Sequence, residues 1–291
     1  MGAARCGLVV DSGAALPLDL LAAATVVPLR VEVGGELLRE GIDIGTEELQ
    51  RRLDGGEVAH SSTPSPGDYL EAMRASSARS LVVLTMAASL SGMHSAATLA
   101  ARLLADEGDP RRVVVIDTGA AAMGLGVVAR VGAQLCRDGG DFAGVSERVR
   151  RAGAEHTMLG TLRTLAPLAR SGRLPALLAG LGDRLHIRPV FELREGRGRR
   201  LALCRSEAAV LRTLEREAVA RAGGWEGVWL LVFHSGAADD AAALRNALAP
   251  RLPVVRSETV VLPAVASAYT GRDMVGVALV PLRNGELQPP D

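Results

Sequence analysis

The chain has 291 residues, and this length favours two domains because a domain typically has roughly 100–200 residues. Its 33 basic and 33 acidic residues give a formal net charge of zero, so no overall field attracts nucleic acid, and nucleic acid is not expected as a partner. Hydrophobic residues make up 48% and aromatic residues 2% of the chain, a composition typical of an α/β core of closely packed small aliphatic side chains.

In the first half, four short apolar runs predict strands. They are Cys6–Asp11, Thr25–Val33, Ser80–Met86 and Val113–Thr118. The segments between them have helical periodicity, and they include a helix with a capping signal at Ser65-Pro66-Gly67-Asp68 and a helix from Ser91 to about Asp106. Helices at Met123–Arg137 and Phe142–Ala154 follow. This alternation predicts a mostly parallel, doubly wound sheet, and we place the first domain at residues 1–155.

The second half, residues 156–291, mixes hairpin and βαβ patterns. Two apolar runs around Gly196 and Gly198 predict a hairpin. The predicted strands are Thr157–Leu162, Arg188–Leu193, Arg200–Arg205, Val228–His234, a strand near Pro253, and Met274–Val280. The predicted helices end at Ser171 and run over about Pro175–Gly180, Ser206–Ala222 and Asp239–Leu248. We therefore predict that residues 156–291 form an α/β domain with a mixed sheet. Terminal segments can exchange between the two domains.

The cysteines and the beginning of the chain bear on location. Cys6, Cys136 and Cys204 are far apart and form no C-x-x-C pair, which argues against a disulfide framework and a zinc site. The apolar stretch at the start is broken by two aspartates and a proline, and no run approaches 18 apolar residues. The sequence therefore predicts a cytoplasmic protein that does not span a membrane.

Two hydroxyl-rich turns provide the most specific local chemistry. They are SSTPSP at Ser61–Pro66 and SLSG at Ser89–Gly92, and each precedes a predicted helix. The unpaired N–H groups at a helix start carry about half a positive charge, which suits a carboxylate or phosphate, and glycine permits close approach. Ser and Thr are also the commonest helix caps, so capping is the better explanation of either turn taken alone. Two such turns facing one crevice favour an anion site.

Strand-end aspartates form a weak internal echo. VVDSGAA at Val9–Ala15 and VIDTGAA at Val115–Ala121 both end an apolar strand with Asp, a hydroxyl residue and Gly. Ligands of open parallel sheets bind beyond the carboxyl ends of the strands, so Asp11-Ser12 and Asp117-Thr118 are candidates for the border of one site. Turn chemistry alone explains either pair equally well.

Other chemistries find less support. Gly124-Leu125-Gly126-Val127-Val128-Ala129 matches a dinucleotide fingerprint, but the preceding turn is too long and a helix follows where a second strand should present an acid. Ser95 lacks the flanking glycines of a nucleophile elbow. The histidines show no metal-ligand spacing, so no metal is expected. His234, at a strand end, merits a test, although a structural hydrogen bond is its simpler interpretation.

The order and spacing of these motifs resemble the DegV family over nearly the whole chain. The similar segments are VVDSGAALP, SSTPSPGDYLEAM, SLSGMHSAATLA, VIDTGAAAMGLG, TLRTLAPLARSGRLP and IRPVFELREG. The resemblance implies two α/β domains that enclose a long-chain fatty acid. It also implies no catalysis by the protein itself and no cofactor. In bacteria, such proteins present the fatty acid carboxylate to a separate ATP-binding kinase subunit that forms acyl phosphate. The resemblance therefore implies two further partners, this kinase subunit and a membrane surface that is contacted transiently for acyl exchange.

The resemblance also implies roles for particular residues. The carboxylate-binding positions are Ser61, Ser62, Thr63, Ser91, Gly92 and Tyr269. Arg173 and Arg205 stand at basic positions expected to face the kinase. This chain departs from the family pattern in having Thr63 in place of Gln and Tyr269 in place of a histidine. A phenol donates a hydrogen bond but offers no positive charge at neutral pH, so the head-group chemistry is expected to differ.

Three hypotheses follow from the sequence. The leading one is a lipid-binding module that delivers its fatty acid to a kinase. The second is a nucleotide-dependent α/β enzyme, which rests on the Gly124 fingerprint and the strand-end aspartates. The third is a scaffold or regulator that keeps the fold but has lost acyl presentation and kinase coupling, which rests on the altered segment around Tyr269.

Overall fold

The computed structural model describes residues 5–163, 168 and 187–283. Sheet A has four parallel strands in the order β2-β1-β6-β7. Their bounds are β1 (Gly7–Asp11), β2 (Ala24–Val27), β6 (Ser80–Thr85) and β7 (Arg112–Asp117). Successive side chains of β1 enter different apolar clusters, Leu8 and Val10 on one face and Val9 on the other. Both faces of the sheet must therefore be covered.

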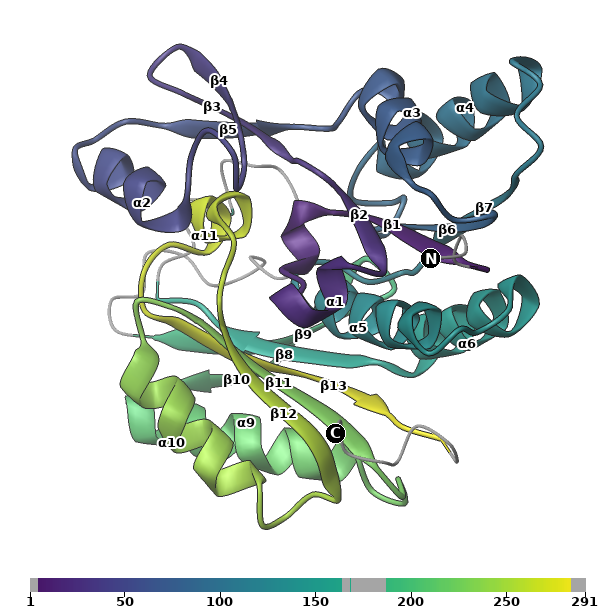
Figure 1. Ribbon diagram of the computed structural model, residues 1–291. Coiled ribbons are helices and arrows are strands. Elements are labelled where there is room, and N and C mark those ends of the chain that lie inside the picture. The colour runs from purple at the N-terminus through teal and green to yellow at the C-terminus, as the bar shows by residue number, and fades with distance from the viewer. Residues whose placement is uncertain (1–4, 164–167, 169–186, 284–291) are drawn as a thin grey trace.

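Helices cover both faces of sheet A. α3 (Pro66–Ala75) and α4 (Met93–Asp106) lie on one face, and α5 (Met123–Arg137) and α6 (Phe142–Glu155) lie on the other (Figure 1). α3 begins at the predicted cap, where the Ser65 side chain accepts from the Asp68 N–H and the Asp68 carboxylate accepts from the Ser65 N–H. The predicted doubly wound parallel sheet is confirmed.

The prediction of one strand from Thr25 to Val33 is wrong. Pro28 has no backbone N–H to donate, so β2 ends at Val27 and the chain continues as β3 (Arg30–Val33) in another sheet. This sheet B consists of β4 (Glu36–Arg39), β3 and β5 (Ala59–Ser62) in antiparallel order. α2 (Thr46–Asp54) precedes β5, and the short η1 (Ser12–Ala14) and α1 (Leu18–Leu21) precede β2. Sheet B was not foreseen from the sequence.

Sheet D has six strands in the order β10-β9-β8-β13-β11-β12 and is mixed, as predicted. Only β11 and β12 pair in parallel among these described strands. Their bounds are β8 (Thr157–Thr161), β9 (Arg188–Arg194), β10 (Arg197–Cys204), β11 (Val228–Ser235), β12 (Val254–Val261) and β13 (Met274–Pro281). The predicted hairpin is present, with its turn at Glu195-Gly196, while Gly198 lies within β10.

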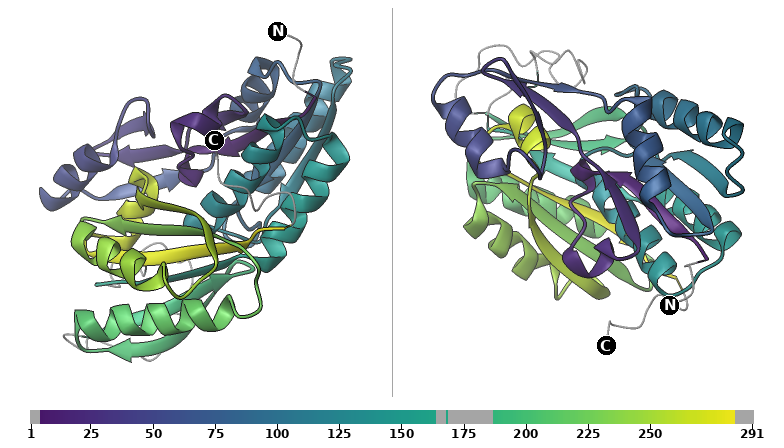
Figure 2. Two further views of the ribbon diagram at one scale, coloured as in Figure 1. Left: turned by 60° about the horizontal axis from the view of Figure 1, so that its bottom comes forward. Right: turned by 45° about the horizontal axis from the view of Figure 1, so that its top comes forward.

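Helices cover both faces of sheet D. α9 (Glu207–Arg221) and α10 (Ala238–Leu248) cover its outer face. The inner face packs against α5, so the layers run from α3 and α4 through sheet A, α5 and α6, and sheet D to α9 and α10 (Figures 1 and 2). The predicted helices at Ser171 and Pro175–Gly180 lie outside the described residues.

A short helix links the two halves of the chain. α11 (Ala264–Thr270) lies between β12 and β13 in the sequence, yet it packs against α2 and β5 of the first half. Both figures show this yellow helix beside α2, away from the green helices α9 and α10. Thr46 at the start of α2 donates a hydrogen bond to the Leu262 carbonyl just before α11, at 2.9 Å.

Arg130 fixes α5 between the sheets. Its side chain is fully buried and donates to the carbonyls of Ala14, Ala15 and Gly126, at 2.8–3.1 Å. It also pairs with Glu258 on β12, at 3.0 Å. One guanidinium thus joins the turn after β1 to the second sheet, and its planar array of donors matches this set of acceptors.

The glycines of the dinucleotide-like fingerprint serve packing. A Cβ at Gly126 would lie 2.8 Å from the Ala14 carbonyl oxygen, and one at Gly124 would lie 3.0 Å from the His156 ring. Both glycines are buried inside α5, which is packed on either side. They permit close approach of protein to protein, so this fingerprint gives no support to a dinucleotide site.

Candidate functional site

A largely apolar cavity of about 170 Å³ lies where the two halves meet. It is bounded by the turns after β1 and β6, the start of α5, the inner face of sheet D, and α11. Its apolar walls come from Leu29, Met86, Leu90, Met93, Ala121, Ala122, Leu125, Met158, Leu162, Leu168, Phe191, Leu193, Leu262, Val265, Ala266 and Met274. On this measure one water needs roughly 10–15 Å³, so the cavity accepts a much larger apolar molecule.

Sheet D supplies a soft part of the wall. Met158 and Met274 line the cavity, and four of the seven methionines of the chain do so in all. An unbranched thioether side chain changes rotamer easily and fills irregular space, so such a wall adapts to ligands of different length. A Cβ at Gly160 would lie 2.9 Å from the Met274 methyl and 3.2 Å from the Phe191 ring. The absence of a side chain at Gly160 therefore makes room for these two.

Hydroxyl groups gather at the other end of the cavity. Ser61 and Ser62 end β5, Thr63 follows them, and Ser91 comes from the turn before α4. The Thr63 and Ser91 hydroxyls are 3.3 Å apart, which joins the two hydroxyl-rich turns. The structure thus brings the two hydroxyl-rich turns together at one end of the cavity. Gly92 is the N-cap residue of α4 and lies beside Thr63 without lining the cavity.

Capping accounts for part of the hydroxyl chemistry. Ser65 caps α3, which leaves the three preceding hydroxyl residues for other partners. The Ser91 hydroxyl accepts weakly from the Met93 N–H, at 3.4 Å, so it also has a role at the start of α4. Ser62 and Thr63 are exposed, which places the polar end of the cavity at the surface.

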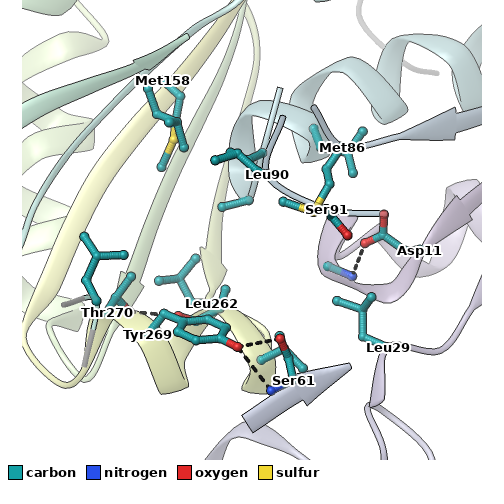
Figure 3. Close-up of a pocket in the computed structure, with 18 of the residues that line it drawn as sticks. Asp11, Leu29, Ser61, Met86, Leu90, Ser91, Met158, Leu262, Tyr269 and Thr270 are labelled. Atoms are coloured by element: carbon teal, nitrogen blue, oxygen red, sulfur yellow. Dashed lines mark hydrogen bonds between the residues drawn. The ribbon is translucent and has the colours of Figure 1, made fainter. Parts of the chain in front are cut away.

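Tyr269 completes this polar end from α11. Its hydroxyl lies 2.5 Å from the Ser61 hydroxyl and accepts from the Ser61 N–H at 3.1 Å (Figure 3). The structure thus brings Tyr269 to the hydroxyl turn over a separation of 208 residues. The phenol also fixes α11 over the cavity, since Val265 and Ala266 of the same helix line it.

The strand-end aspartates separate into one inside and one outside the cavity. Asp11 lines the cavity and is buried, whereas Asp117 and Thr118 do not line it. The exposed Asp117 carboxylate accepts from the N–H groups of Gly119 and Ala88. The Ser12 hydroxyl donates to Glu40 and accepts from the Leu29 N–H, so Ser12 serves the turn.

Glu40 is a site component that the sequence analysis missed. It is buried between the halves, where it accepts from the Ser12 hydroxyl at 2.5 Å and from the Val265 N–H at the start of α11 at 2.6 Å. Burial raises the pKa of the Glu40 carboxyl. No motif surrounds Glu40 in the sequence, and its partners are up to 225 residues away, so only the fold reveals its role.

Arg173 and Arg205 are the two predicted docking arginines, and His234 is the histidine that the sequence singles out for a test. Arg173 falls outside the described residues, and Arg205 is exposed directly after β10. His234 ends a strand on the face of sheet D that packs on α9 and α10, and it does not line the cavity. Burial lowers the pKa of the His234 imidazole. Neither Arg205 nor His234 lines the cavity.

The described residues offer neither a metal centre nor a membrane-crossing helix. Within residues 5–163, 168 and 187–283, no group of three or more His, Cys, Asp or Glu side chains is placed to hold a metal ion. Over the same ranges, no helix has the length and apolar character needed to cross a bilayer.

Comparison with known proteins gives a consistent result. The family model described as "Uncharacterised protein, DegV family" matches residues 5–282. A DegV domain-containing protein of Streptomyces coelicolor is 35% identical over 280 residues, 94% of this chain and 97% of its own. A DegV family protein from Thermus thermophilus, solved in a study of its fatty acid binding, is 31% identical to this chain. The two structures match with a TM-score of 0.86 over 96% of this chain and 100% of the Thermus chain. DegV of Bacillus subtilis, 19% identical with a TM-score of 0.83 over 96% of this chain and 100% of its own, shares the fold.

Proposed function

The chain belongs to the DegV family, and on that basis we propose that it binds a long-chain fatty acid with the carboxylate at the hydroxyl turns. The observation that carries the proposal is the cavity, whose apolar walls end in Ser61, Ser62, Thr63, Ser91 and Tyr269 at the surface. The similar Thermus thermophilus protein, a fatty acid binder, supports this ligand class. An amphipathic ligand with one anionic end fits both parts of the cavity.

The proposed affinity comes mainly from the acyl chain. Burying ~14 methylenes at ~0.8 kcal/mol each contributes about 11 kcal/mol before the cost of ordering the ligand. One charge-assisted hydrogen bond to the head group contributes roughly 1.5–3 kcal/mol. The hydroxyl end therefore orients the ligand, while the aliphatic and methionine side chains hold it.

We further propose that the protein acts in the cytoplasm as a carrier without catalysis of its own, and that it presents the carboxylate to an ATP-binding kinase subunit. The support is the exposure of Ser62 and Thr63, which leaves the head group accessible to a second protein, and the exposed Arg205. Residues 1–155 would supply the hydroxyl turns, and residues 156–291, which include α11, would cover the acyl chain. Formation of acyl phosphate from the loaded protein, ATP and the kinase subunit tests this step.

Native mass spectrometry of freshly purified protein tests the ligand class. We expect an added mass that matches a C14–C18 fatty acid, lost after extraction with organic solvent and regained on incubation with palmitate. An added mass that matches a dinucleotide would contradict the proposal and support the nucleotide-dependent enzyme. A protein that purifies empty and that no fatty acid stabilises thermally would support a regulator that has lost the lipid site.

Removal of the Tyr269 hydroxyl is expected to weaken palmitate binding by less than about tenfold. Tyr269→Phe removes a neutral hydrogen-bonding group, with a net contribution of roughly 0.5–1.5 kcal/mol, and leaves the apolar walls intact. Tyr69→Phe is the matched control, because the Tyr69 hydroxyl is buried outside the cavity and has no hydrogen-bond partner among the described residues. Equilibrium titration with labelled palmitate measures both variants. Complete loss of binding by Tyr269→Phe alone would show that the head group, not the chain, dominates affinity.

A further inference from the structure

Asp11 has a carboxyl oxygen that nothing in the described structure satisfies. The side chain is only 3% exposed and lines the cavity at the carboxyl end of β1. Its Oδ1 accepts from the Gly13 N–H at 2.9 Å, while its Oδ2 has no hydrogen-bond partner among the described residues. Buried polar atoms nearly always have a partner, so an orphaned oxygen at a cavity wall indicates a group that binds there.

Asp117 provides an internal comparison, because the same motif places it at the end of β7. Its Oδ1 likewise accepts from the N–H two residues later, at 2.9 Å. Its Oδ2 then accepts from the Ala88 N–H at 3.2 Å, and the carboxylate is exposed. Both carboxylate oxygens of Asp117 thus have a partner. At Asp11 the second oxygen is left for another partner.

The surroundings of Asp11 favour its protonated form. Glu40 lies close enough for its charge to act on Asp11, and the Glu40 oxygens accept two short hydrogen bonds, from Ser12 and Val265. Glu40 is therefore the better site for the negative charge of the two carboxyls, and the proton remains on Asp11. Burial first, and the Glu40 charge second, raise the pKa of Asp11 to about 7.

Asp11 lies at the hydroxyl end of the cavity. β1 pairs in parallel with β6, so the turn after Asp11 lies beside the turn that begins at Met86 and leads to Ser91. Leu29, bonded through its N–H to Ser12, lines the cavity next to Asp11, and the pairing of Arg30 with Ser62 places Leu29 beside Thr63. Figure 3 shows Asp11 and Leu29 facing the same space as Ser61 and Ser91.

We propose that Asp11 is a head-group ligand that carries a proton on Oδ2 and donates it in a hydrogen bond to the carboxylate of the bound fatty acid. This proposal rests on the proposed fatty acid binding and assigns it a further binding residue. No bond is made or broken, since one proton is shared between two carboxyl groups. Such a short, charge-assisted hydrogen bond gives the head group a second neutral O–H donor beside the Tyr269 phenol.

Other titratable groups around Asp11 leave this arrangement intact. Burial first, and the charges of Asp11 and Asp68 second, raise the pKa of the Tyr69 phenol on α3, so this phenol stays protonated at neutral pH. Asp68, next to Tyr69, is paired with Arg30 at 2.6 Å. On α4, His94 contacts the Thr85 hydroxyl of the neighbouring strand at 3.4 Å. Glu40 is the charged group acting most directly on Asp11.

The proposal makes fatty acid binding dependent on pH. An ordinary carboxyl group titrates near pH ~4, so the ligand is an anion at neutral pH. Below its pKa of about 7, Asp11 is protonated and donates; above it, two negative charges face each other. If only the protonated form binds, palmitate affinity falls roughly 25-fold between pH 6.5 and pH 8.5.

Titration of labelled palmitate and labelled hexadecanol at pH 6.5 and pH 8.5 tests the proposal. For the native protein we expect the roughly 25-fold loss with palmitate and no loss with the uncharged alcohol. Asp11→Asn keeps an acceptor for Gly13 and offers an amide donor without titrating. It should bind palmitate several-fold more weakly at pH 6.5 and equally at both pH values, while Asp117→Asn should keep the native profile.

The outcomes separate this proposal from the proposed function. Absence of palmitate binding at both pH 6.5 and pH 8.5 would contradict fatty acid binding itself. Tight binding with no dependence on pH, or an unchanged dependence in Asp11→Asn, would contradict the role of Asp11 alone. If Asp11→Asn does not fold, the ¹³C chemical shift of the Asp11 carboxyl in the native protein decides: a titration midpoint that does not rise on palmitate binding overturns the proposal.

Discussion

Replacement of Arg130 by methionine is expected to lower the free energy of unfolding by about 3–5 kcal/mol. The variant would leave Glu258 and three backbone carbonyls without the donors that Arg130 provides, in a region that is fully buried around the guanidinium. The cost arises mainly at the buried carbonyls, because an unsatisfied buried acceptor is costly, whereas the Glu258 side chain is 26% exposed and keeps the Trp229 indole N–H as a donor. Urea denaturation followed by far-UV circular dichroism measures the change.

Arg137 on the same helix provides the control. It pairs with Asp19, but its side chain is 32% exposed and that of Asp19 is 62% exposed. Arg137→Met should therefore cost less than about 1 kcal/mol. Equal losses in the two variants would contradict the role assigned to Arg130. The double variant with Glu258→Gln should recover part of the loss, because no unpaired carboxylate then remains.

Replacement of Ala266 by tryptophan is expected to reduce palmitate affinity at least about 100-fold. Ala266 lines the cavity from α11, and an indole at this position would fill space that the acyl chain needs. Loss of even half of the buried methylenes would remove several kcal/mol, which corresponds to a factor of roughly 10³–10⁴. Labelled palmitate titration measures the affinity, and thermal unfolding without ligand checks that the fold is kept.

Ala208→Trp, at an exposed position of α9 far from the cavity lining, controls for the added indole. It should bind palmitate as the native protein does. Unchanged affinity in Ala266→Trp would show that the acyl chain occupies another part of the molecule, and it would overturn the placement of the ligand.

Local signals made much of the fold predictable. The helical periodicity of apolar residues and the capping residues predicted α3, α5 and α6. Ser65 and Asp68 form a capping box at α3, and the apolar residues of α5 are those that the structure buries. One error in the first half came from treating Pro28 as a strand residue, although it cannot donate to the ladder. Sheet B was missed because strands of four residues, such as β3 and β5, show little periodicity. α11 was missed because a helix of seven residues is also too short to show a clear helical period.

The site was predictable only in part, for a physical reason. Ser61 and Ser91 stand in recognisable turns before helices, so sequence alone indicated their chemistry. Asp11 and Asp117 share a motif, yet one is buried and the other exposed, and this difference arises from packing rather than from local sequence. Glu40 acts through Ser12 and Val265, which lie 28 and 225 residues away, and no local pattern encodes such contacts.

The position of α11 has a consequence for the order of events during synthesis. The hydroxyl turns belong to residues 61–63 and 91, whereas α11 spans residues 264–270 near the end of the chain. A ribosome releases the first half long before the second, and domains tend to fold as they emerge. The hydroxyl turns therefore emerge from the ribosome well before α11 does, and the cavity cannot be closed over them until residues 264–270 have been made.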